Sequence, residues 1–583
     1  MTITEALQIA QTAPAAAPKF DVKLACGFTP LHLQTLLTAE VQQRVRGRKV
    51  AISSGLYGDL AGTLESVARG DGEQPDCLAV VIEWPDLDPR LGFRSAGSWG
   101  SGAVSDIASS ARAMQARIVE ALSRAPAGIR IAVTLPSLPL PPLFHSCGWQ
   151  ASEAQLLLER DILGMAAELA QGMRAMVVNG QALSESSAAG QRFDLKSDLL
   201  TGLPYTVQHA GAVAAALATA LVPPAPKKGI ISDLDDTLWS GIVGETGPEG
   251  VSWDLASHHQ LHGLYQKMLA SLCENGVLVG VASKNDPAVV KKTFERADLL
   301  IRSEQVFPFE VHWDAKSGSI ARILNVWNIG ADAVIFVDDS PMELAEVAAA
   351  HPGIECICFP KSDYAAGLAM LRRLRDLCGK ERISQEDTIR LESIRRGAEF
   401  QEQAAGGAAP EQFLQQLNAT ISIDFDCGSE ARTLELINKT NQFNLNGIRL
   451  TEADWQKRLS QPGAFVAGIS YEDKFGMLGT IAVIQGLERE GVLHVPTWVM
   501  SCRAFARRIE HGCLAALFDR FQASRVELDY TATSKNGPVK DFLLAMLGEE
   551  PTGPVRIMRR QFEAQCPPLY HTVREVRRTY ASG

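Results

Sequence analysis

The amino-acid sequence predicts an α/β protein built from more than one domain. Short runs rich in β-branched residues alternate with longer helical stretches over most of the 583 residues, an order that is typical of largely parallel sheets covered by helices. The proline-rich stretch 222–228, VPPAPKK, separates two such series and is expected to join two domains. At about 150 residues per domain, this length corresponds to roughly three or four domains.

Composition and charge exclude several classes of protein. Hydrophobic residues make up 46% of the chain and charged residues 21%, which excludes extensive disorder and fibrous architecture. The formal net charge of −11 is unfavourable for a general nucleic-acid binder. The 11 cysteines form no CxxC pair, so reduced thiols are expected. The sequence begins without a signal peptide and its longest apolar run is too short to span a bilayer, which predicts a cytoplasmic protein without membrane contact.

The elements expected before the proline-rich joint form one α/β domain. Residues 1–20 are rich in alanine, proline and threonine and are expected to be flexible. The domain itself occupies residues 21–222. Strands are predicted at 22–26, 49–53, 77–84, 129–135 and 175–179, and helices at 106–124, 152–170 and 208–221.

A second α/β domain is expected over residues 229–378. Strands are predicted at 229–233, 277–283, 333–338 and 354–359, and helices at 257–275, 286–296, 316–327 and 341–350. Residues 379–410 are charged and are expected to form a helical linker. The last region, 411–583, mixes strands and helices in an α+β pattern.

The strongest functional signal follows the first strand of this second domain. Residues 230–238 read IISDLDDTL, so that a hydrophobic strand leads directly into an Asp-x-Asp-x-Thr loop. Asp233 and Asp235 would then lie at the carboxyl end of a parallel strand, where open α/β sheets bind ligands. One carboxylate can attack phosphorus or bind a metal while the other transfers protons. Alone, the motif is as well explained by a surface turn that caps a helix.

Polar residues of matching chemistry follow two later strands and precede one helix. Ser283, Lys284 and Asn285 offer donors, Lys316 offers a cation for phosphoryl oxygens, and Asp338 offers a further carboxylate. A phosphoryl group beside several carboxylates requires a metal ion, because the negative charges otherwise repel each other. Together these residues make the turn explanation much weaker.

The four motifs resemble those of haloacid-dehalogenase (HAD) superfamily phosphatases. The resemblance implies that Asp233 is the nucleophile and Asp235 the general acid and base. It also implies Mg²⁺ held by Asp233, Asp235 and Asp338, with Asp339 beside the last of these. The residues implied in phosphate or substrate binding are Thr237, Ser283, Lys284, Asn285 and Lys316. The gaps between the motifs are too short for an inserted cap domain, so an open site is expected.

Longer strings within the motifs narrow the resemblance. DLDDTLWSGIVGE (233–245), VASKND (281–286), HWDAKS (312–317) and FVDDSPME (336–343) resemble the FkbH-like proteins, a capless HAD branch. Such proteins take a three-carbon glyceryl unit from 1,3-bisphosphoglycerate and pass it to the phosphopantetheine arm of an acyl carrier protein. The resemblance therefore implies a small phosphorylated acid as substrate and an acyl carrier protein as partner. A stand-alone phosphatase of a soluble phosphosugar or phosphoacid, and a non-catalytic docking protein, remain as alternatives.

The region after residue 410 resembles the FkbH C-terminal region, which is similar to an N-acetyltransferase (GNAT) fold. The asparagine-rich segment 438–447 is explained equally well by a polar loop or by a surface that binds a polar substrate. Cys502 lies in a cationic strand-to-helix turn and is the candidate for a thioester-forming nucleophile, although a buried structural cysteine explains it as well. Candidates for acyl or pantetheine binding are Asn441, Asn444, Arg503 and Arg507. Ala506, Arg507 and Arg508 stand where a glycine-rich turn is expected in this family.

The first domain resembles the SGNH-hydrolase-like domains that are fused to long FkbH-like proteins. Its first strand leads into Cys26-Gly27-Phe28-Thr29 and lacks the Gly-Asp-Ser of active enzymes. Before the final helix, only Asp198 and His209 are present, without an Asp-x-x-His motif. Because a serine hydrolase needs its base and orienting acid within hydrogen-bond reach, the domain is expected to be non-hydrolytic.

Overall fold

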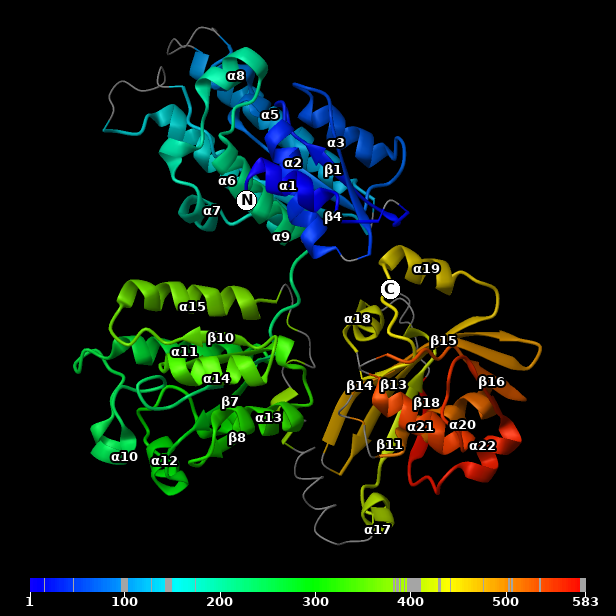
Figure 1. Cartoon of the computed structure of the whole chain (residues 1–583). Helices are drawn as coiled ribbons and strands as arrows, with labels where there is room; N and C mark the ends of the chain where they lie inside the picture. Colours follow the sequence, from blue (N-terminus) through cyan, green and yellow to red (C-terminus); the bar gives the residue numbers. More distant parts are fainter. Residues whose placement is uncertain are drawn as a thin grey trace. The chain divides into compact units, whose positions relative to one another are not determined.

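The computed structural model gives the fold of the chain in two compact units, Met1–Pro224 and Ala225–Gly583. The boundary lies within the proline-rich stretch. Each unit is described by itself (Figure 1). The structure describes residues 1–583 except 15, 46, 96–102, 127, 142–148, 173–174, 381–382, 384–386, 388–389, 393, 396–409, 428–430, 441, 475, 502–503, 505–506, 534–535 and 577–583. Among the described residues, no helix combines the length and the apolar character needed to cross a membrane.

The first unit contains a parallel sheet with strand order β2-β1-β3-β4-β5. Its strands are β1 (Lys19–Ala25), β2 (Lys49–Ser54), β3 (Cys77–Val81), β4 (Arg130–Thr134) and β5 (Ala175–Val177). Its helices are α1 (Ile3–Ala10), α2 (Leu31–Arg44), α3 (Leu60–Arg69), α4 (Trp84–Leu87), α5 (Val104–Ser123), α6 (Glu153–Gln171), α7 (Gly180–Ser186), α8 (Leu195–Thr201) and α9 (Val207–Leu221), with short 3-10 helices at Pro89–Leu91 and Ala189–Gln191.

Both faces of this sheet are buried under helices. Leu78 and Val80 pack with α3, α5 and α6, whereas Ala79 and Val81 pack with α2 and α9. Because successive side chains of a strand point to opposite faces, β3 contributes to two separate apolar cores. This is why its sequence, CLAVV, is apolar throughout rather than alternating.

The segment expected to be flexible at the N-terminus instead contains helix α1. Thr2 caps this helix: its side chain accepts from the backbone N–H of Glu5, and the Glu5 carboxylate accepts from the N–H of Thr2. Ala6 is buried in the same apolar core as α2. The alanine-rich composition suggested flexibility, but the Thr-x-x-Glu capping box is a helix-start signal.

A second parallel sheet, in the order β10-β9-β6-β7-β8, begins the second unit. Its strands are β6 (Gly229–Ser232), β7 (Leu278–Ser283), β8 (Val306–Val311), β9 (Val334–Asp338) and β10 (Glu355–Cys358). Its helices are α10 (Val243–Thr246), α11 (Gln260–Glu274), α12 (Pro287–Phe294), α13 (Lys316–Trp327), α14 (Pro341–Ala350) and α15 (Tyr364–Cys378), with 3-10 helices η5 (Pro248–Gly250), η6 (Ser303–Gln305) and η7 (Ala331–Ala333).

This sheet also lies between two apolar cores. Ile230 faces α11, α12 and α15, and its neighbour Ile231 faces α13 and α14. Strand β8 was not expected from the sequence, because Pro308 interrupts the run VFPFEV. The structure tolerates this proline because β8 is an edge strand, where one side of the backbone needs no partner. The helical linker expected at 379–410 lies largely outside the described residues.

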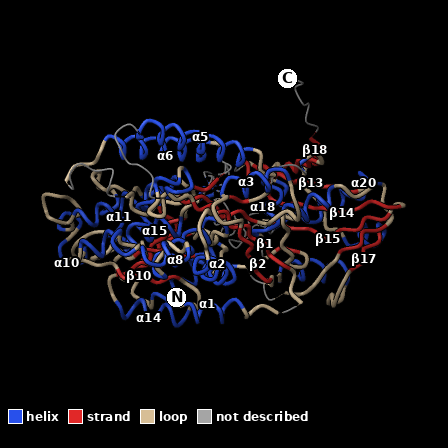
Figure 2. The backbone as a smooth tube through the Cα atoms, turned by 90° about the horizontal axis from the view of Figure 1, so that it is seen from above, coloured by secondary structure: helices blue, strands red, loops and turns tan. Residues whose placement is uncertain are grey.

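The remaining sheet of the second unit is mainly antiparallel, in the order β17-β16-β15-β14-β13-β11-β18, with β12 paired to β15. Figure 2 shows β13, β14 and β15 as strands in this part of the chain. The strands are β11 (Thr420–Asp424), β12 (Phe443–Asn444), β13 (Ala464–Asp473), β14 (Gly476–Arg489), β15 (Val492–Met500), β16 (Arg525–Leu528), β17 (Val555–Met558) and β18 (Thr572–Val576). The helices are α17 (Pro410–Gln415), α18 (Ala431–Lys439), α19 (Glu452–Leu459), α20 (Ile509–Phe521), α21 (Gly537–Leu547) and α22 (Arg559–Gln565). The α/β fold class predicted from the sequence is confirmed.

Candidate active site

The polar residues predicted from the motifs meet at one edge of the second parallel sheet. Asp233 directly follows β6, Ser283 ends β7, and Asp338 ends β9. Lys316 is the first residue of α13, the helix that follows β8. Parallel strands place their carboxyl ends at the same edge, so four separate segments of sequence contribute to one site.

Lys316 is the centre of the charged groups in this site. Its Nζ lies 2.9 Å from Oδ1 of Asp233 and 2.6 Å from Oδ2 of Asp338, and it also contacts Glu343. Burial alone would lower the pKa of Lys316, but the two aspartates raise it above its usual value. Burial raises the pKa of Asp233, which the Lys316 charge partly offsets. The site therefore holds a charged ammonium between two aspartates whose pKa is raised by burial.

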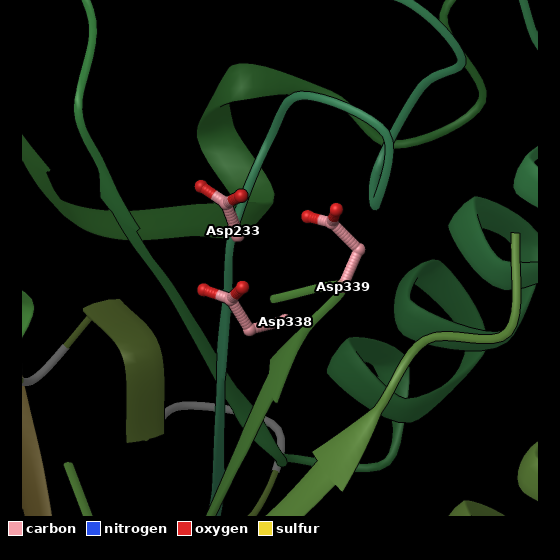
Figure 3. Close-up of side chains that lie close together, drawn as sticks. All are labelled: Asp233, Asp338 and Asp339. Carbon is pink, nitrogen blue, oxygen red and sulfur yellow. The ribbon is translucent and has the colours of Figure 1, made fainter. Parts of the chain in front are cut away.

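Three carboxylates come close enough together to hold a metal ion. Oxygen atoms of Asp233, Asp338 and Asp339 lie within 4.8 Å of one another, and Figure 3 shows the three side chains at the ends of their strands. Oδ1 of Asp338 also accepts from the backbone N–H of Ser340 at 2.8 Å. Hard oxygen ligands of this kind suit Mg²⁺. The donor set therefore fits the predicted ion.

Asp235 was expected among the metal ligands, but its carboxylate is engaged elsewhere. Oδ1 accepts from Nε1 of Trp239 at 2.8 Å and from the backbone N–H of Val243 at 3.0 Å. Oδ2 accepts from Nδ2 of Asn285 at 3.0 Å. The cluster of three carboxylates contains Asp339 and not the side chain of Asp235, and the prediction that Asp235 binds the metal stays a prediction. The next residue, Asp236, has a φ of 53° in the turn that follows.

The predicted phosphate binders have different surroundings. Ser283 is buried, and its Oγ accepts from Nδ2 of Asn285 at 3.2 Å, so its own proton can be donated to a phosphoryl oxygen. Asn285 instead holds Ser283 and Asp235 in place. Thr237 is also buried, and its hydroxyl donates to Oδ1 of Asp339 at 3.3 Å. Asn285 and Thr237 therefore hold other residues of the site in place rather than face a substrate.

Two residues that the sequence analysis did not single out complete the ion-pair network. Glu343 on α14 accepts from Lys284 through Oε1 at 2.8 Å and contacts Lys316 through Oε2. Lys361 follows β10 and bridges Asp236 at 2.8 Å and Asp339 at 2.5 Å. Glu343 lies within the string FVDDSPME, five residues after Asp338, so its presence in the motif was an available signal. No sequence signal indicated Lys361, because only the fold brings this residue to the site.

The candidates in the last region fall into two groups. Asn441, Cys502 and Arg503 lie outside the described residues. Asn444 is buried, its Nδ2 donates to the carbonyl of Thr440 at 3.0 Å, and its Oδ1 accepts from the N–H of Gly447 at 2.8 Å.

Arg507 is also unsuited to the ligand predicted for it. Its guanidinium is 4% exposed, and its Nε lies 3.5 Å from Oδ2 of Asp473. It also lies over the ring of Tyr471, 5.6 Å from the centroid. Arg507 and Asn444 are thus internal structural groups, and the structure does not offer them to a pantetheine phosphate.

The asparagine-rich segment is a structured loop against the edge of β15. The N–H of Leu445 donates to the carbonyl of Trp498, and its own carbonyl accepts from the N–H of Thr531. Nδ2 of Asn446 donates to the carbonyls of Pro496 at 2.9 Å and Asp529 at 3.1 Å. The polar side chains therefore satisfy the protein's own backbone groups, which favours the loop interpretation over a substrate surface.

A buried polar network occupies the corresponding edge of the first parallel sheet. Oγ of Ser137 donates to Glu83 at 2.7 Å and lies 2.8 Å from Nε2 of His209, whose Nδ1 lies 2.9 Å from Oγ of Ser187. Tyr205 also donates to Glu83, at 2.5 Å. The hydroxyl of Ser137 therefore lies between Glu83 and the His209 imidazole.

This arrangement does not activate a serine nucleophile. Among the described residues, the hydrogen-bond partners of the His209 imidazole are Ser137 and Ser187, and not Asp198. Burial, with a smaller effect of the Arg192 charge, lowers the pKa of His209 to about 4. The imidazole is therefore neutral at pH 7, and its ring nitrogens contact Ser137 and Ser187.

Comparisons with known proteins found similar solved structures but no similar sequence. Neither a family model nor a curated protein sequence matches the chain. The crystal structure of the N-terminal part of BF1531 from Bacteroides fragilis, containing a phosphatase domain complexed with Mg, matches with a TM-score of 0.50 and 19% identity, covering 64% of this chain and 98% of that one. This likeness shows a shared fold.

Two further solved structures match smaller parts of the chain. An uncharacterized protein from Corynebacterium glutamicum has a TM-score of 0.19 and 14% identity, and covers 26% of this chain and 98% of its own. An extracellular lipase from Streptomyces rimosus has a TM-score of 0.24 and 15% identity, and covers 35% of this chain and 100% of its own.

Proposed function

We propose that the second unit carries a Mg²⁺-dependent, HAD-type phosphatase or phosphotransferase. The observation that carries the proposal is the convergence of Asp233, Asp338 and Lys316 at the carboxyl edge of a parallel sheet, all buried and in contact. A similar fold belongs to the BF1531 fragment, whose description includes a phosphatase domain and Mg. Soluble, cytoplasmic action remains part of the proposal.

The chemistry assigned to the chain's own residues is a double displacement. The carboxylate of Asp233 attacks phosphorus, and the bond from phosphorus to the leaving oxygen breaks as Asp235 gives that oxygen a proton. Water then attacks the aspartyl phosphate, Asp235 takes the water's proton, and Asp233 is released with inorganic phosphate. In this structure, hydrogen bonds from Trp239, Val243 and Asn285 hold the Asp235 carboxylate in place.

Phosphoryl oxygens are bound by residues of opposite or complementary charge. Lys316 and the hydroxyl of Ser283 face the site and would stabilise the charge that develops on the transferred group. Asp233, Asp338 and Asp339 would hold Mg²⁺, which supplies the positive charge that lets a phosphate approach carboxylates. The carboxylates in the network outnumber its lysines, which is why a cation is needed.

The substrate is proposed to be a small phosphorylated acid whose acyl unit is presented to an acyl carrier protein. The described chain between β6 and α11 contains only α10 and η5, so no inserted domain closes this side of the site. Trp313 and Met342 lie within the motif strings and are 73% and 77% exposed. An open edge of this kind suits a reactive group carried on another protein.

A stand-alone phosphatase of a soluble phosphoacid is the second candidate. It is favoured by the burial of Asn444 and Arg507, which removes two of the groups expected to bind a pantetheine arm. Intact-mass spectrometry of a holo carrier protein, incubated with enzyme and 1,3-bisphosphoglycerate, separates the two candidates, because the acyl phosphate of this donor can acylate the carrier thiol with release of inorganic phosphate. Carrier loading supports the first, and phosphate release without loading supports the second.

The basic phosphatase proposal is tested with Asp233→Asn. This variant should lose phosphate release from p-nitrophenyl phosphate while keeping its circular dichroism spectrum. EDTA should stop the wild-type reaction and added Mg²⁺ should restore it. Turnover that persists in EDTA, or in Asp233→Asn, would overturn the assignment.

A further inference from the structure

Two lysines in this site are joined by one carboxylate but differ sharply in exposure. Lys316 is 3% exposed and lies among Asp233, Asp338 and Glu343, whereas the side chain of Lys284 is 39% exposed. Oε1 of Glu343 accepts from Lys284 at 2.8 Å, and Oε2 contacts Lys316. The two ammonium nitrogens are thus separated by one carboxylate and two hydrogen bonds, about 7 Å at most.

The positions of the two lysines give them different access to a substrate. Lys316 is fixed beside the nucleophile Asp233, so it serves the transferred phosphoryl group. Lys284 directly follows Ser283 at the end of β7, on the solvent side of Glu343. An ammonium has three N–H donors, and Glu343 takes one of them, which leaves capacity for a second anionic group.

We propose that Lys284, oriented by Glu343, binds the carboxylate of the substrate. This contact would make the site selective for phosphorylated acids over phosphate esters that carry no carboxylate. This inference rests on the proposed function and deepens it by assigning the second anionic group. A chain of two or three carbon atoms with an anion at each end spans the gap between Lys316 and Lys284. A carboxylate at the rim then pairs with a cation that is already held in place, which reduces the entropy lost on binding.

The decisive experiment compares two substrates that differ at one end only. 3-Phosphoglycerate and glycerol 3-phosphate carry the same phosphate ester on three carbons, but only the first has a carboxylate. Wild-type enzyme should favour 3-phosphoglycerate in kcat/KM by about 10- to 100-fold, the range for a hydrogen bond to a charged group. Lys284→Gln should remove most of this preference by losing far more activity on the acid than on the ester.

Lys291→Gln is the matched control. Lys291 is an exposed lysine on α12, outside the ion-pair network, and its loss changes the net charge by the same amount. The selectivity ratio should keep its wild-type value in this variant. If Lys284→Gln lowers activity on both substrates equally, or if the wild type shows no preference, the assignment of Lys284 to the carboxylate is wrong.

Failure of this inference can be told apart from failure of the proposed function. If the wild type releases phosphate from neither substrate, it is titrated with both ligands by calorimetry in the presence of Mg²⁺. If the wild type binds 3-phosphoglycerate more tightly than glycerol 3-phosphate, and Lys284→Gln loses this difference, the inference is supported although the proposed phosphatase activity is not. Equal or absent binding of the two ligands would overturn the inference.

Discussion

Oδ2 of Asp338 lies 2.6 Å from Nζ of Lys316, and both side chains are buried. Asp338 ends β9 and Lys316 begins the helix after β8, on opposite sides of the strand that carries Asp233. The pair therefore spans the sheet edge in front of Asp233. Because a buried pair loses several kcal/mol when one partner is removed, about 3–5 kcal/mol in typical cases, this geometry fixes the lysine before any substrate arrives.

Asp235→Asn should slow turnover by about 10²- to 10⁴-fold, the usual cost of losing a general acid and base. The asparagine oxygen can still accept from Trp239 and Val243, so the fold and KM should change little. Steady-state kinetics with p-nitrophenyl phosphate measures this split. Trp239→Phe is the control, because it removes one donor to Asp235 and leaves the carboxylate. If Trp239→Phe lowers kcat as much as Asp235→Asn does, the role assigned to the Asp235 carboxylate is contradicted.

Asp233→Asn should raise the melting temperature of the metal-free protein. Burial raises the pKa of Asp233, so its ionised form is costly at neutral pH and a neutral amide of the same shape relieves that cost. Lys316 is not left unpaired by this change, because it keeps its ion pairs with Asp338 and Glu343. A gain of about 2–4 °C is expected for each kcal/mol relieved. Differential scanning calorimetry with and without Mg²⁺ tests this. Mg²⁺ should stabilise the wild type more than the variant, and the reverse order would contradict a metal site at Asp233.

The first unit should lose stability as the pH falls from about 6.5 to about 4. The pKa of His209 is lowered to about 4 by burial, so the unfolded chain binds a proton in this window that the folded chain does not. The stability contributed by the neutral imidazole is complete above the unfolded pKa and declines as pH falls toward the folded one. The loss amounts to about 3 kcal/mol at most. In urea titrations, His209→Gln should show a flatter pH dependence than wild type, and an unchanged slope would exclude His209 as its source.

The first unit should not hydrolyse small esters. The proton of Ser137 is directed to Glu83, and His209 has no carboxylate partner among the described residues, so no base is available to a serine. p-Nitrophenyl acetate assays on Asp233→Asn protein check this without interference from the second unit. Esterase activity that disappears in Ser137→Ala would show that the network is catalytic.

The sequence was most informative where local pattern and chemistry coincide. The strand predicted at 229–233 corresponds to β6, because an apolar run buried on both faces ends at a polar loop. By contrast, β8 was not predicted, because it contains Pro308. A proline argues against a strand unless the strand is known to lie at the edge of its sheet. The site residues on strand ends could be predicted because parallel topology brings those ends together.

Side-chain partners were less predictable than positions. Asp235 could be assigned to the site from its motif, but its hydrogen bonds with Trp239, Val243 and Asn285 have no distinctive signature in the sequence. Lys361 reaches Asp339 only because β10 lies beside β9. Asn444 resembled a binding residue because an amide that serves its own backbone has the same sequence signature as one that serves a ligand.

The loop that runs along β15 has a consequence for handling the protein. Where β16 ends at Leu528, the outer side of β15 would present unpaired backbone groups, and such an edge recruits strands from other molecules. Leu445 and Asn446 cover it from within the same chain. Shortened versions of the protein that begin after residue 446 would uncover this edge, and self-association through it is the expected cause of poor solubility.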